Sequence, residues 1–153
     1  MRGIIADAVE AVGGTVHRKG TFLIEDGPRF ATRAESHMFR SWGCDLIGMT
    51  SAPEAFLARE AEIDYASMAH ITDYDSWHEE EEAVTSSMVI ETLRKNIGTV
   101  QEALAVAVQN IDEDKVVPAH TTLDTALATS RDAMDDSVIE KLHPIVARAL
   151  KLD

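Results

Sequence analysis

The sequence predicts an α/β fold in which a central mixed or parallel sheet is flanked by helices. Three observations indicate this class: short apolar runs alternate with amphipathic stretches, the order strand, helix, strand, helix, strand, helix recurs, and no internal repeat or linker interrupts it. Strands connected through helices run parallel with right-handed crossovers. We therefore expect their carboxyl ends to share one edge, where open α/β sheets bind ligands.

The first part of the chain predicts two helices and at least one strand. Residues 2–12 have helical spacing of apolar side chains, and a Gly–Gly pair ends this helix. Residues 15–25 are typical of one or two strands, and residues 26–30, DGPRF, form a turn. A second helix follows and ends at Gly43. Its apolar stripe consists of Phe30, Ala34, Met38 and Trp42.

The middle of the chain predicts two more strands around a third helix. Residues 45–49, DLIGM, form a short apolar strand. Ser51 and Glu54 have the spacing of a capping box, which predicts a helix over residues 52–61. Residues 65–72, YASMAHIT, form the next strand.

The last part of the chain is predicted to be helical. Thr85 or Ser86 caps a long helix, and the acidic run 79–82 before it complements the helix dipole. The stripe of this long helix consists of Val89, Leu93, Ile97, Val100, Leu104 and Val108. Pro118 interrupts the chain, and residues 121–153 are helical again. The apolar face of this tail consists of Leu142, Ile145, Val146 and Leu150.

Composition restricts the function classes. The chain has 153 residues, the size of a single domain, and a formal net charge of −13. This charge argues against nucleic acid and against anionic membrane surfaces, because both require a basic footprint. The one cysteine, Cys44, cannot form an internal disulfide, and no signal peptide or membrane-spanning run is present. We expect a cytoplasmic protein, in which an anionic ligand needs local help from helix N-termini or from Arg29 or Arg33.

Three loops follow the predicted strands: EDGPRF, MTSAPE and TDYDSW. Asp73 and Asp75 of the third loop have three interpretations: a solvated turn, a metal site, or recognition of a polar heterocycle. The metal site is disfavoured, because the remaining ligands of a calcium loop are missing and His78 has no zinc-type spacing to a partner. A carboxyl group can accept from an amino group or, when protonated, donate to a ring nitrogen.

The other two loops also have a structural and a functional interpretation. Phe30 is by general tendency a core residue, but a ring that follows a turn at a strand end can also face a crevice. Thr50 and Ser51 either cap a helix or offer hydroxyls and amides to an anion. Nucleophilic catalysis is disfavoured, because the chain has no Gly-x-Ser-x-Gly elbow and its cysteine precedes an apolar strand.

Taken together, the motifs GPRF, GMT-x-x-PE and TDYD-x-W resemble the C-terminal half of the purine nucleoside phosphorylase family, in particular its S-methyl-5′-thioadenosine phosphorylase branch. The resemblance covers about residues 15–96 and is weakest for residues 112–153. It implies one nucleoside-phosphorylase-type domain over residues 1–153. The N-terminal half of that fold, with its phosphate loop and first strands, is expected to be missing.

The resemblance also implies roles for individual residues. Asp75 matches the residue that hydrogen-bonds purine N7 and supplies a proton there, and Asp73 matches the one that recognises the 6-amino side. Phe30 matches the ring that packs on the base. The remaining positions match residues of the sugar, phosphate and 5′ sites: Met49 under the ribose, Thr50 at phosphate and sugar, and Val89 and Ile90 in the 5′ pocket.

The implied reaction is phosphorolysis of a 6-aminopurine nucleoside, most closely S-methyl-5′-thioadenosine, to adenine and 5-methylthioribose 1-phosphate. The enzyme is then a pentosyltransferase that uses inorganic phosphate as co-substrate and has no cofactor and no metal. The resemblance further implies a homo-oligomer, by the family pattern a trimer. Adenosine as substrate, a purine-binding module without turnover and a structural remnant stay open as alternatives.

Overall fold

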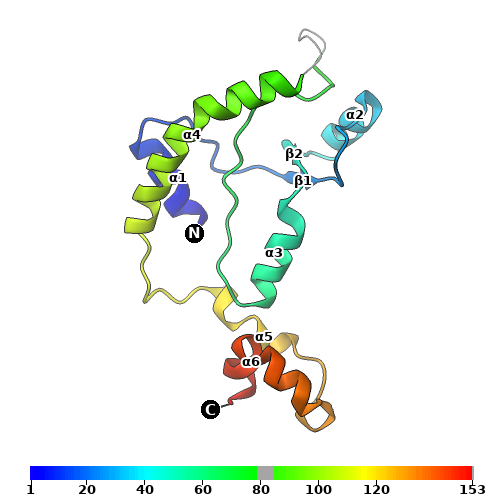
Figure 1. Ribbon diagram of the computed structural model, residues 1–153, viewed down its shortest axis with the longest axis vertical. Helices are drawn as coiled ribbons and strands as arrows, with labels where there is room; N and C mark the ends of the chain where they lie inside the picture. Colours follow the sequence, from blue (N-terminus) through cyan, green and yellow to red (C-terminus); the bar gives the residue numbers. More distant parts are fainter. Residues whose placement is uncertain (79–84, 153) are drawn as a thin grey trace. The chain divides into compact units, whose positions relative to one another are not determined.

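The computed structural model describes residues 1–78 and 85–152. Within these residues, β1 (Phe22–Ile24) and β2 (Leu46–Gly48) form a parallel two-stranded sheet, which confirms the predicted α/β class (Figure 1). The helices are α1 (Arg2–Ala11), α2 (Arg33–Ser41), α3 (Ser51–Glu60), α4 (Ser86–Gln109), α5 (Leu123–Ala126) and α6 (Asp136–Leu150). The chain divides into two compact units: residues 1–52 with 67–111, and residues 53–66 with 112 onwards.

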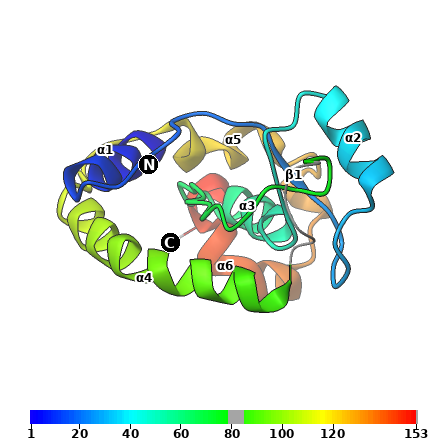
Figure 2. The ribbon, with the colours of Figure 1, turned by 90° about the horizontal axis from the view of Figure 1, so that it is seen from above.

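The core of the first unit lies between α1 and α4, which run side by side in both ribbon views (Figures 1 and 2). Most of the buried side chains are small: Ala6 and Ala8 on α1, beside the larger Val9, and Ala103 and Ala107 on α4. Small side chains at the contact let two helices approach closely. The predicted end of α1 is confirmed, because the backbone at Gly13 has a φ of +78°, a conformation that favours glycine.

α4 starts where the sequence predicts but packs on a different face. Thr85 is its N-cap, and the Thr85 hydroxyl accepts a hydrogen bond from the Met88 amide at 3.4 Å. The predicted apolar stripe is wrong as the packing face, since four of its members are exposed. These are Leu93, Ile97, Leu104 and Val108. Ala103 and Ala107 pack instead, on a neighbouring stripe of the helix. The acidic run 79–82 lies outside the described residues.

The sheet brings two strand ends to one edge. Phe22 pairs with Leu46 and Ile24 pairs with Gly48 in parallel register. The strand predicted over residues 15–25 is too long. Only Phe22–Ile24, which pair with β2, form a strand. Arg18, in the part that is not a strand, forms ion pairs with carboxylates of α1.

α2 does not include all residues of its predicted apolar stripe. It begins after Thr32, and Phe30 and Trp42 both lie outside the helix. The Thr32 hydroxyl accepts from the Glu35 amide at 3.3 Å, and the Glu35 carboxylate accepts from the Thr32 amide at 2.8 Å, so the two residues form a capping box. The stripe is wrong as a core face: Met38 and Trp42 are exposed, and Ser36 is the buried residue of this helix. The predicted end at Gly43 is confirmed, with φ at +78°.

α3 ends with a polar residue in an unusual conformation. The predicted capping box at its start is wrong, because Ser51 is already the first helical residue. At the other end, the Ile63 amide donates to the Ala58 carbonyl at 2.8 Å and the Glu62 amide to the Arg59 carbonyl at 3.2 Å. This is a Schellman end, with Glu62 at φ +58° in the place that glycine usually occupies. A non-glycine residue in this region needs compensating contacts.

The predicted strand over residues 65–72 does not form. Exposure along this segment alternates, with half-buried side chains at residues 66, 68, 70 and 72, as in a strand with two faces. However, no backbone hydrogen bond joins residues 65–72 to another described segment. The segment thus alternates in exposure like a strand but pairs with no other strand among the described residues. The sheet of the described residues consists of β1 and β2.

In the second unit, Glu62 joins the end of α3 to α5 and α6. Its carboxylate accepts from Arg148 of α6 at 2.6 and 2.7 Å and from the Leu123 amide of α5 at 2.9 Å. Arg148 also pairs with Asp124 at 2.7 Å. The helical prediction for residues 121–153 is only partly right. α5 has four residues and α6 starts at Asp136, where the Asp135 carboxylate caps it by accepting from the Ser137 amide at 2.8 Å.

We expect Glu62 to make the stability of the second unit depend on pH. Hydrogen bonds from Arg148 and from the Leu123 amide lower the pKa of the Glu62 carboxyl. A carboxyl with a lowered pKa in the folded state stabilises the fold above its ordinary pKa of about 4.3, and this contribution is lost as pH falls through the folded-state value. Glu62→Gln should therefore lower the melting temperature at pH 7, and the difference from wild type should shrink towards acidic pH.

Thermal melts followed by circular dichroism between pH 7 and pH 2 would measure this difference. Glu60→Gln is the matched control, because Glu60 is exposed and near the same helix end. A Glu62→Gln effect that stays constant over the whole pH range would contradict the assignment.

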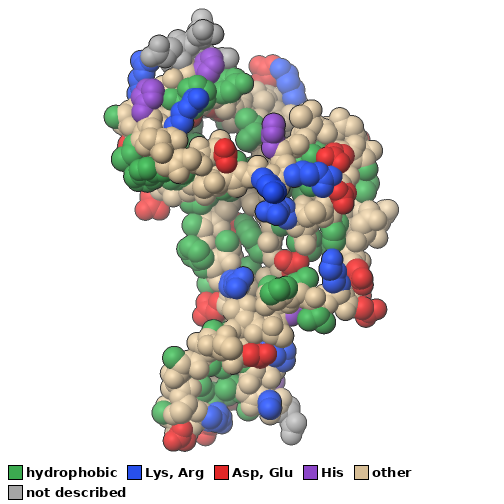
Figure 3. Space-filling model, turned by 180° about the vertical axis from the view of Figure 1, so that it is seen from behind, with side chains coloured by type: hydrophobic (Ala, Val, Ile, Leu, Met, Phe, Trp, Pro, Cys, Tyr) green, Lys and Arg blue, Asp and Glu red, His purple; other side chains and the backbone are tan. Residues whose placement is uncertain are grey.

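Apolar side chains also lie at the surface. On the face seen in Figure 3, hydrophobic side chains are exposed among acidic and basic ones. Among the described residues, no helix is both long enough and apolar enough to cross a bilayer.

Candidate functional site

Two of the three predicted loops meet at the carboxyl edge of the sheet. The loop after β1 carries Phe30, and the loop after β2 carries Met49 and Thr50. A β-carbon built on Gly27 would lie 2.9 Å from the Met49 Sδ, so the first loop lies directly against Met49. The Glu25 amide donates to the Gly48 carbonyl at 2.9 Å and extends the pairing beyond β1. Parallel pairing therefore brings two sequence-predicted regions together.

The Phe30 ring is a surface group. Phe30 is 61% exposed, so the expectation from general burial tendencies, a core position, is wrong here. Phe30 precedes the Thr32 N-cap and lies in an irregular loop, not on the buried side of α2. The ring is available to a ligand.

The loop around Phe30 is fixed by an ion pair that sequence reasoning missed. Arg29 donates to both carboxylate oxygens of Glu35, at 2.8 and 2.6 Å, and also to the Phe30 carbonyl at 3.1 Å. The Glu35 carboxylate raises the pKa of the Arg29 guanidinium, while Arg29 and the amide and hydroxyl of Thr32 lower the pKa of the Glu35 carboxyl to about 2. The Thr-x-x-Glu spacing of residues 32–35 is a sequence signal for the capping box, which places Glu35 at the start of α2, but it does not predict the contact with Arg29.

This ion pair changes the expectation for Arg29. The sequence offers Arg29 as a local cation for an anionic ligand, but the guanidinium is engaged by Glu35 in a two-point contact. An anion at this edge would have to compete with a carboxylate that is already in place.

The third loop holds its two aspartates differently. Asp75 is half-buried, and its Oδ1 accepts from the Ser76 amide at 2.7 Å, while the Asp75 carbonyl accepts from the His78 amide at 3.0 Å. Asp73 is exposed, and its Oδ2 accepts from the Thr72 hydroxyl at 2.5 Å. Each carboxylate thus accepts one hydrogen bond from a sequence neighbour, and Asp75 is the less exposed of the two residues.

Aromatic rings surround the Asp75 turn. The rings of Tyr74 and His78 stack with centroids 4.6 Å apart, and Trp77 makes edge contacts with both. The Arg40 guanidinium of α2 lies 3.6 Å from the centre of the Trp77 ring. This contact joins the third loop to the helix that follows the first loop.

Replacing Arg40 with alanine is expected to loosen the third loop. A cation–π contact at an exposed position contributes about 0.5–1 kcal/mol, and without it the Trp77 indole becomes more accessible to water. In a Trp42→Phe background, Trp77 is the sole remaining tryptophan of the chain. Its emission should shift to longer wavelength, and amide exchange over residues 73–78 should accelerate. Arg94→Ala, on the exposed surface of α4, is the control and should change neither measurement.

The two predicted residues of the 5′ pocket lie on α4. Val89 is half-buried and Ile90 is 48% exposed, both near the N-terminal end of the helix. Among the described residues, the hydrogen bonds and ring contacts do not join these positions to the three loops. Their place in a common site therefore stays a prediction.

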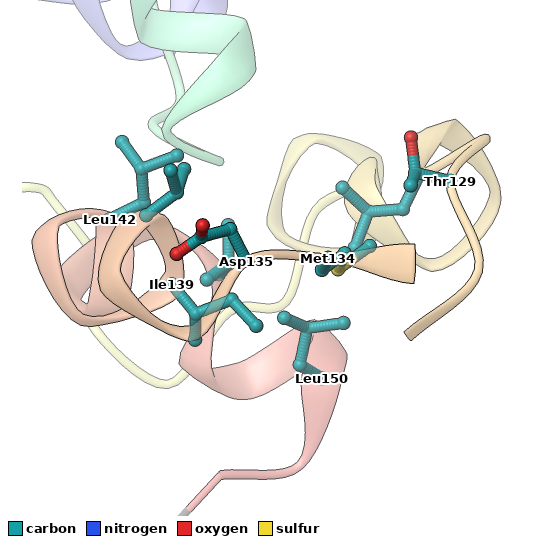
Figure 4. Close-up of a pocket in the computed structure, with 9 residues that line it drawn as sticks. Thr129, Met134, Asp135, Ile139, Leu142 and Leu150 are labelled. Carbon is teal, nitrogen blue, oxygen red and sulfur yellow. The ribbon is translucent and has the colours of Figure 1, made fainter. Parts of the chain in front are cut away.

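An apolar groove lies elsewhere, in the second unit. It has a volume of about 290 Å³ and is lined by side chains of α6 and of the segment before it, among them Met134, Ile139 and Leu142 (Figure 4). The groove contains none of the sequence-predicted site residues. Among the residues that the structure describes, no group of three or more His, Cys, Asp or Glu side chains could hold a metal ion.

Comparisons with known proteins agree with the loop motifs. A curated S-methyl-5′-thioadenosine phosphorylase from Chloroflexus aurantiacus is 46% identical over 148 residues, which are 97% of this chain and 51% of the relative. One from Thermosynechococcus vestitus is 42% identical over 98% of this chain and 53% of the relative. The chain thus spans about half the length of the curated relatives it matches.

Solved structures give the same result. A methylthioadenosine phosphorylase from an antarctic soil metagenomic library superimposes with a TM-score of 0.85 at 41% identity, over 94% of this chain and 51% of that one. A methylthioadenosine phosphorylase from Schistosoma mansoni in complex with adenine superimposes with a TM-score of 0.69 at 32% identity, over 97% of this chain and 51% of that one. The family model described as the phosphorylase superfamily matches residues 1–109, and the chain therefore belongs to the phosphorylase superfamily.

Proposed function

We propose that this chain provides the purine-binding side of a phosphorylase that acts on S-methyl-5′-thioadenosine. The reaction yields adenine and 5-methylthioribose 1-phosphate, with inorganic phosphate as co-substrate and without a cofactor. The observation that carries the proposal is the convergence of the strand-end loops, where Gly27, near the exposed Phe30 ring, lies against Met49. The names of the relatives, and the adenine bound to one of them, support the same substrate class.

In this proposal the base is held by an aromatic ring and two carboxyl groups. Phe30 stacks on the purine, since its exposed ring offers a flat apolar face. Asp75 hydrogen-bonds N7 and supplies the proton that the leaving purine takes up. Asp73, more exposed, accepts from the 6-amino side, partly through water. Two carboxyl groups suit an exocyclic amino donor, which favours adenine over a 6-oxopurine.

The sugar and phosphate are assigned to residues after β2 and on α4. Met49 lies under the ribose, and Thr50 offers its exposed hydroxyl to phosphate and sugar. Val89 and Ile90 form an apolar wall for the methylthio group at the 5′ position, which distinguishes this substrate from adenosine. Phosphate attacks the anomeric carbon as the bond to the purine breaks. The charge that develops on the purine is relieved by proton transfer from Asp75.

Adenine release from S-methyl-5′-thioadenosine, measured by chromatography with and without phosphate, tests the proposal. We expect release only with phosphate, and faster than from adenosine. Calorimetric titration with adenine is the second measurement. Adenine binding without release in either condition would favour a binding module over an enzyme, and the absence of both would contradict the proposal.

We also propose that the chain works in the cytoplasm and assembles as a homotrimer, as the family resemblance implies. The exposed apolar side chains of α4 support self-association, because such surfaces are typical of interfaces. Size-exclusion chromatography with light scattering would measure the assembly, and a stable monomer at all concentrations would contradict the trimer.

A further inference from the structure

We propose that Glu35 is a positioning residue that holds the Phe30 ring in place for the base. This inference rests on the proposed function, because it concerns the ring assigned to stack on the purine. Glu35 itself lies in the first turn of α2 and is not assigned to touch any ligand. It acts through the backbone of the loop on both sides of Phe30.

The Phe30 ring lies largely at the surface. A buried ring is oriented by its neighbours in the core, but a ring that is 61% exposed has much less of that support. Its direction then depends on the backbone that carries it. A stacking ring on an unrestrained loop would lose conformational freedom on binding, and this loss weakens affinity.

Several hydrogen bonds converge on the Glu35 carboxylate. Before Phe30, Arg29 donates to both carboxylate oxygens, at 2.8 and 2.6 Å. After Phe30, the Thr32 amide and hydroxyl both donate to Glu35 Oε2 at 2.8 Å. Arg29 in addition donates to the Phe30 carbonyl at 3.1 Å. One carboxylate thus fixes both sides of a short segment with Phe30 between them.

The loop that carries Phe30 is also fixed to the sheet. Gly27, at the other end of the turn, approaches Met49 so closely that a β-carbon there would lie 2.9 Å from the Met49 Sδ. The loop is therefore anchored at Met49 on one side and at Glu35 on the other. Arg29 and Glu35 are both partly exposed, with side-chain exposures of 59% and 30%. A surface ion pair of this kind adds little to overall stability, so its main effect is local.

Three variants separate positioning from helix capping. Glu35→Ala removes both the contact to Arg29 and the capping box. Arg29→Ala removes the contact but keeps the capping box, and Thr32→Ala weakens the cap while it leaves the Arg29–Glu35 pair intact. If Glu35 positions the loop, Arg29→Ala should resemble Glu35→Ala, and Thr32→Ala should not. If Glu35 only caps α2, Thr32→Ala should resemble Glu35→Ala.

Hydrogen exchange of the full chain is the first measurement and requires no ligand. We expect faster exchange over residues 29–32 in Glu35→Ala and in Arg29→Ala, with α4 unchanged. Unchanged exchange in the loop would overturn the inference whether or not the chain binds adenine. Faster loop exchange in a protein that does not bind adenine would support the positioning role of Glu35 and would count against the proposed function alone.

Adenine affinity is the second measurement. Base stacking on an aromatic ring is worth about fivefold or more in affinity, so Phe30→Ala should weaken adenine binding by at least that factor. Glu35→Ala should weaken adenine binding by a smaller factor than Phe30→Ala does. In the Phe30→Ala background, Glu35→Ala should cause no further loss, because its effect passes through the ring. Fully additive losses would overturn the inference.

Discussion

Replacing Asp75 with asparagine is expected to slow phosphorolysis about 10²- to 10⁴-fold while adenine affinity changes little. In the proposed site, the asparagine amide would still donate a hydrogen bond to N7, but it would not supply the proton that the leaving purine requires. Asp75 is half-buried, and its Oδ1 accepts from the Ser76 amide at 2.7 Å, which restricts the carboxylate to few orientations. A positioned acid of this kind acts on the rate more than on ground-state binding.

Asp75→Ala completes the test, because alanine removes both the proton and the hydrogen bond. It should lower the rate as Asp75→Asn does and weaken adenine binding as well, by about 10-fold for the loss of one hydrogen bond. 7-Deazaadenine, which has a carbon in place of N7, should bind wild type and Asp75→Ala equally. Asp112→Asn, at an exposed position of the second unit, is the control. Equal adenine affinity of wild type and Asp75→Ala would contradict a contact to N7.

The strand ends were predictable from the sequence because local signals and topology agree there. The apolar runs around Leu23 and Ile47 are flanked by turn residues, and parallel pairing follows from the helix between them. These rules predict that the loops with Phe30 and Met49 leave the same edge, and Gly27 does contact Met49. The exposure of Phe30 was not predictable in this way, because it depends on where α2 begins.

The predicted third strand does not form, which shows that a local sequence pattern does not determine strand pairing. Residues 66, 68, 70 and 72 are half-buried in alternation, as the sequence predicts for a strand. A ladder needs a second segment in register, and no property of residues 65–72 themselves determines whether that segment is beside them. Hydrophobic alternation is therefore evidence for a two-faced extended segment and only indirectly for a sheet.

α4 shows the same limit for a helix. Its large apolar residues, such as Leu104 and Val108, form a clear stripe in the sequence, yet they are exposed. The adjacent stripe of Ala103 and Ala107 is buried instead, because short side chains permit α4 and α1 to approach closely. Periodicity identifies apolar stripes on a helix, but it does not tell which of two neighbouring stripes packs in the core. A hydrophobicity scale gives large side chains the higher values and therefore selects the wrong stripe here.

Replacing Ala103 with leucine should therefore destabilise the first unit, although leucine is the more apolar residue. Ala103 is 1% exposed, so the three additional carbon atoms have no space unless α1 or α4 moves. Overpacking of this kind costs about 1–3 kcal/mol, which corresponds to a decrease in melting temperature of roughly 2–12 °C for a chain of this length. If instead the predicted stripe of large residues were the packing face, Ala103 would be near the surface and the change would be almost neutral.

Ala105→Leu is the matched control, because it introduces the same side chain two residues away at an exposed position of α4. Leucine and alanine have similar helix propensities, so the difference between the two variants isolates packing from helix formation. Denaturant unfolding followed by circular dichroism gives the two free energies, and hydrogen exchange in α1 shows whether its contact with α4 is the part that fails. Equal stability of the two variants would contradict the α1–α4 interface. Loss of stability in Ala103→Leu alone, with α1 exchanging faster, is the expected result, since the interface depends on side chains small enough for the two helices to meet.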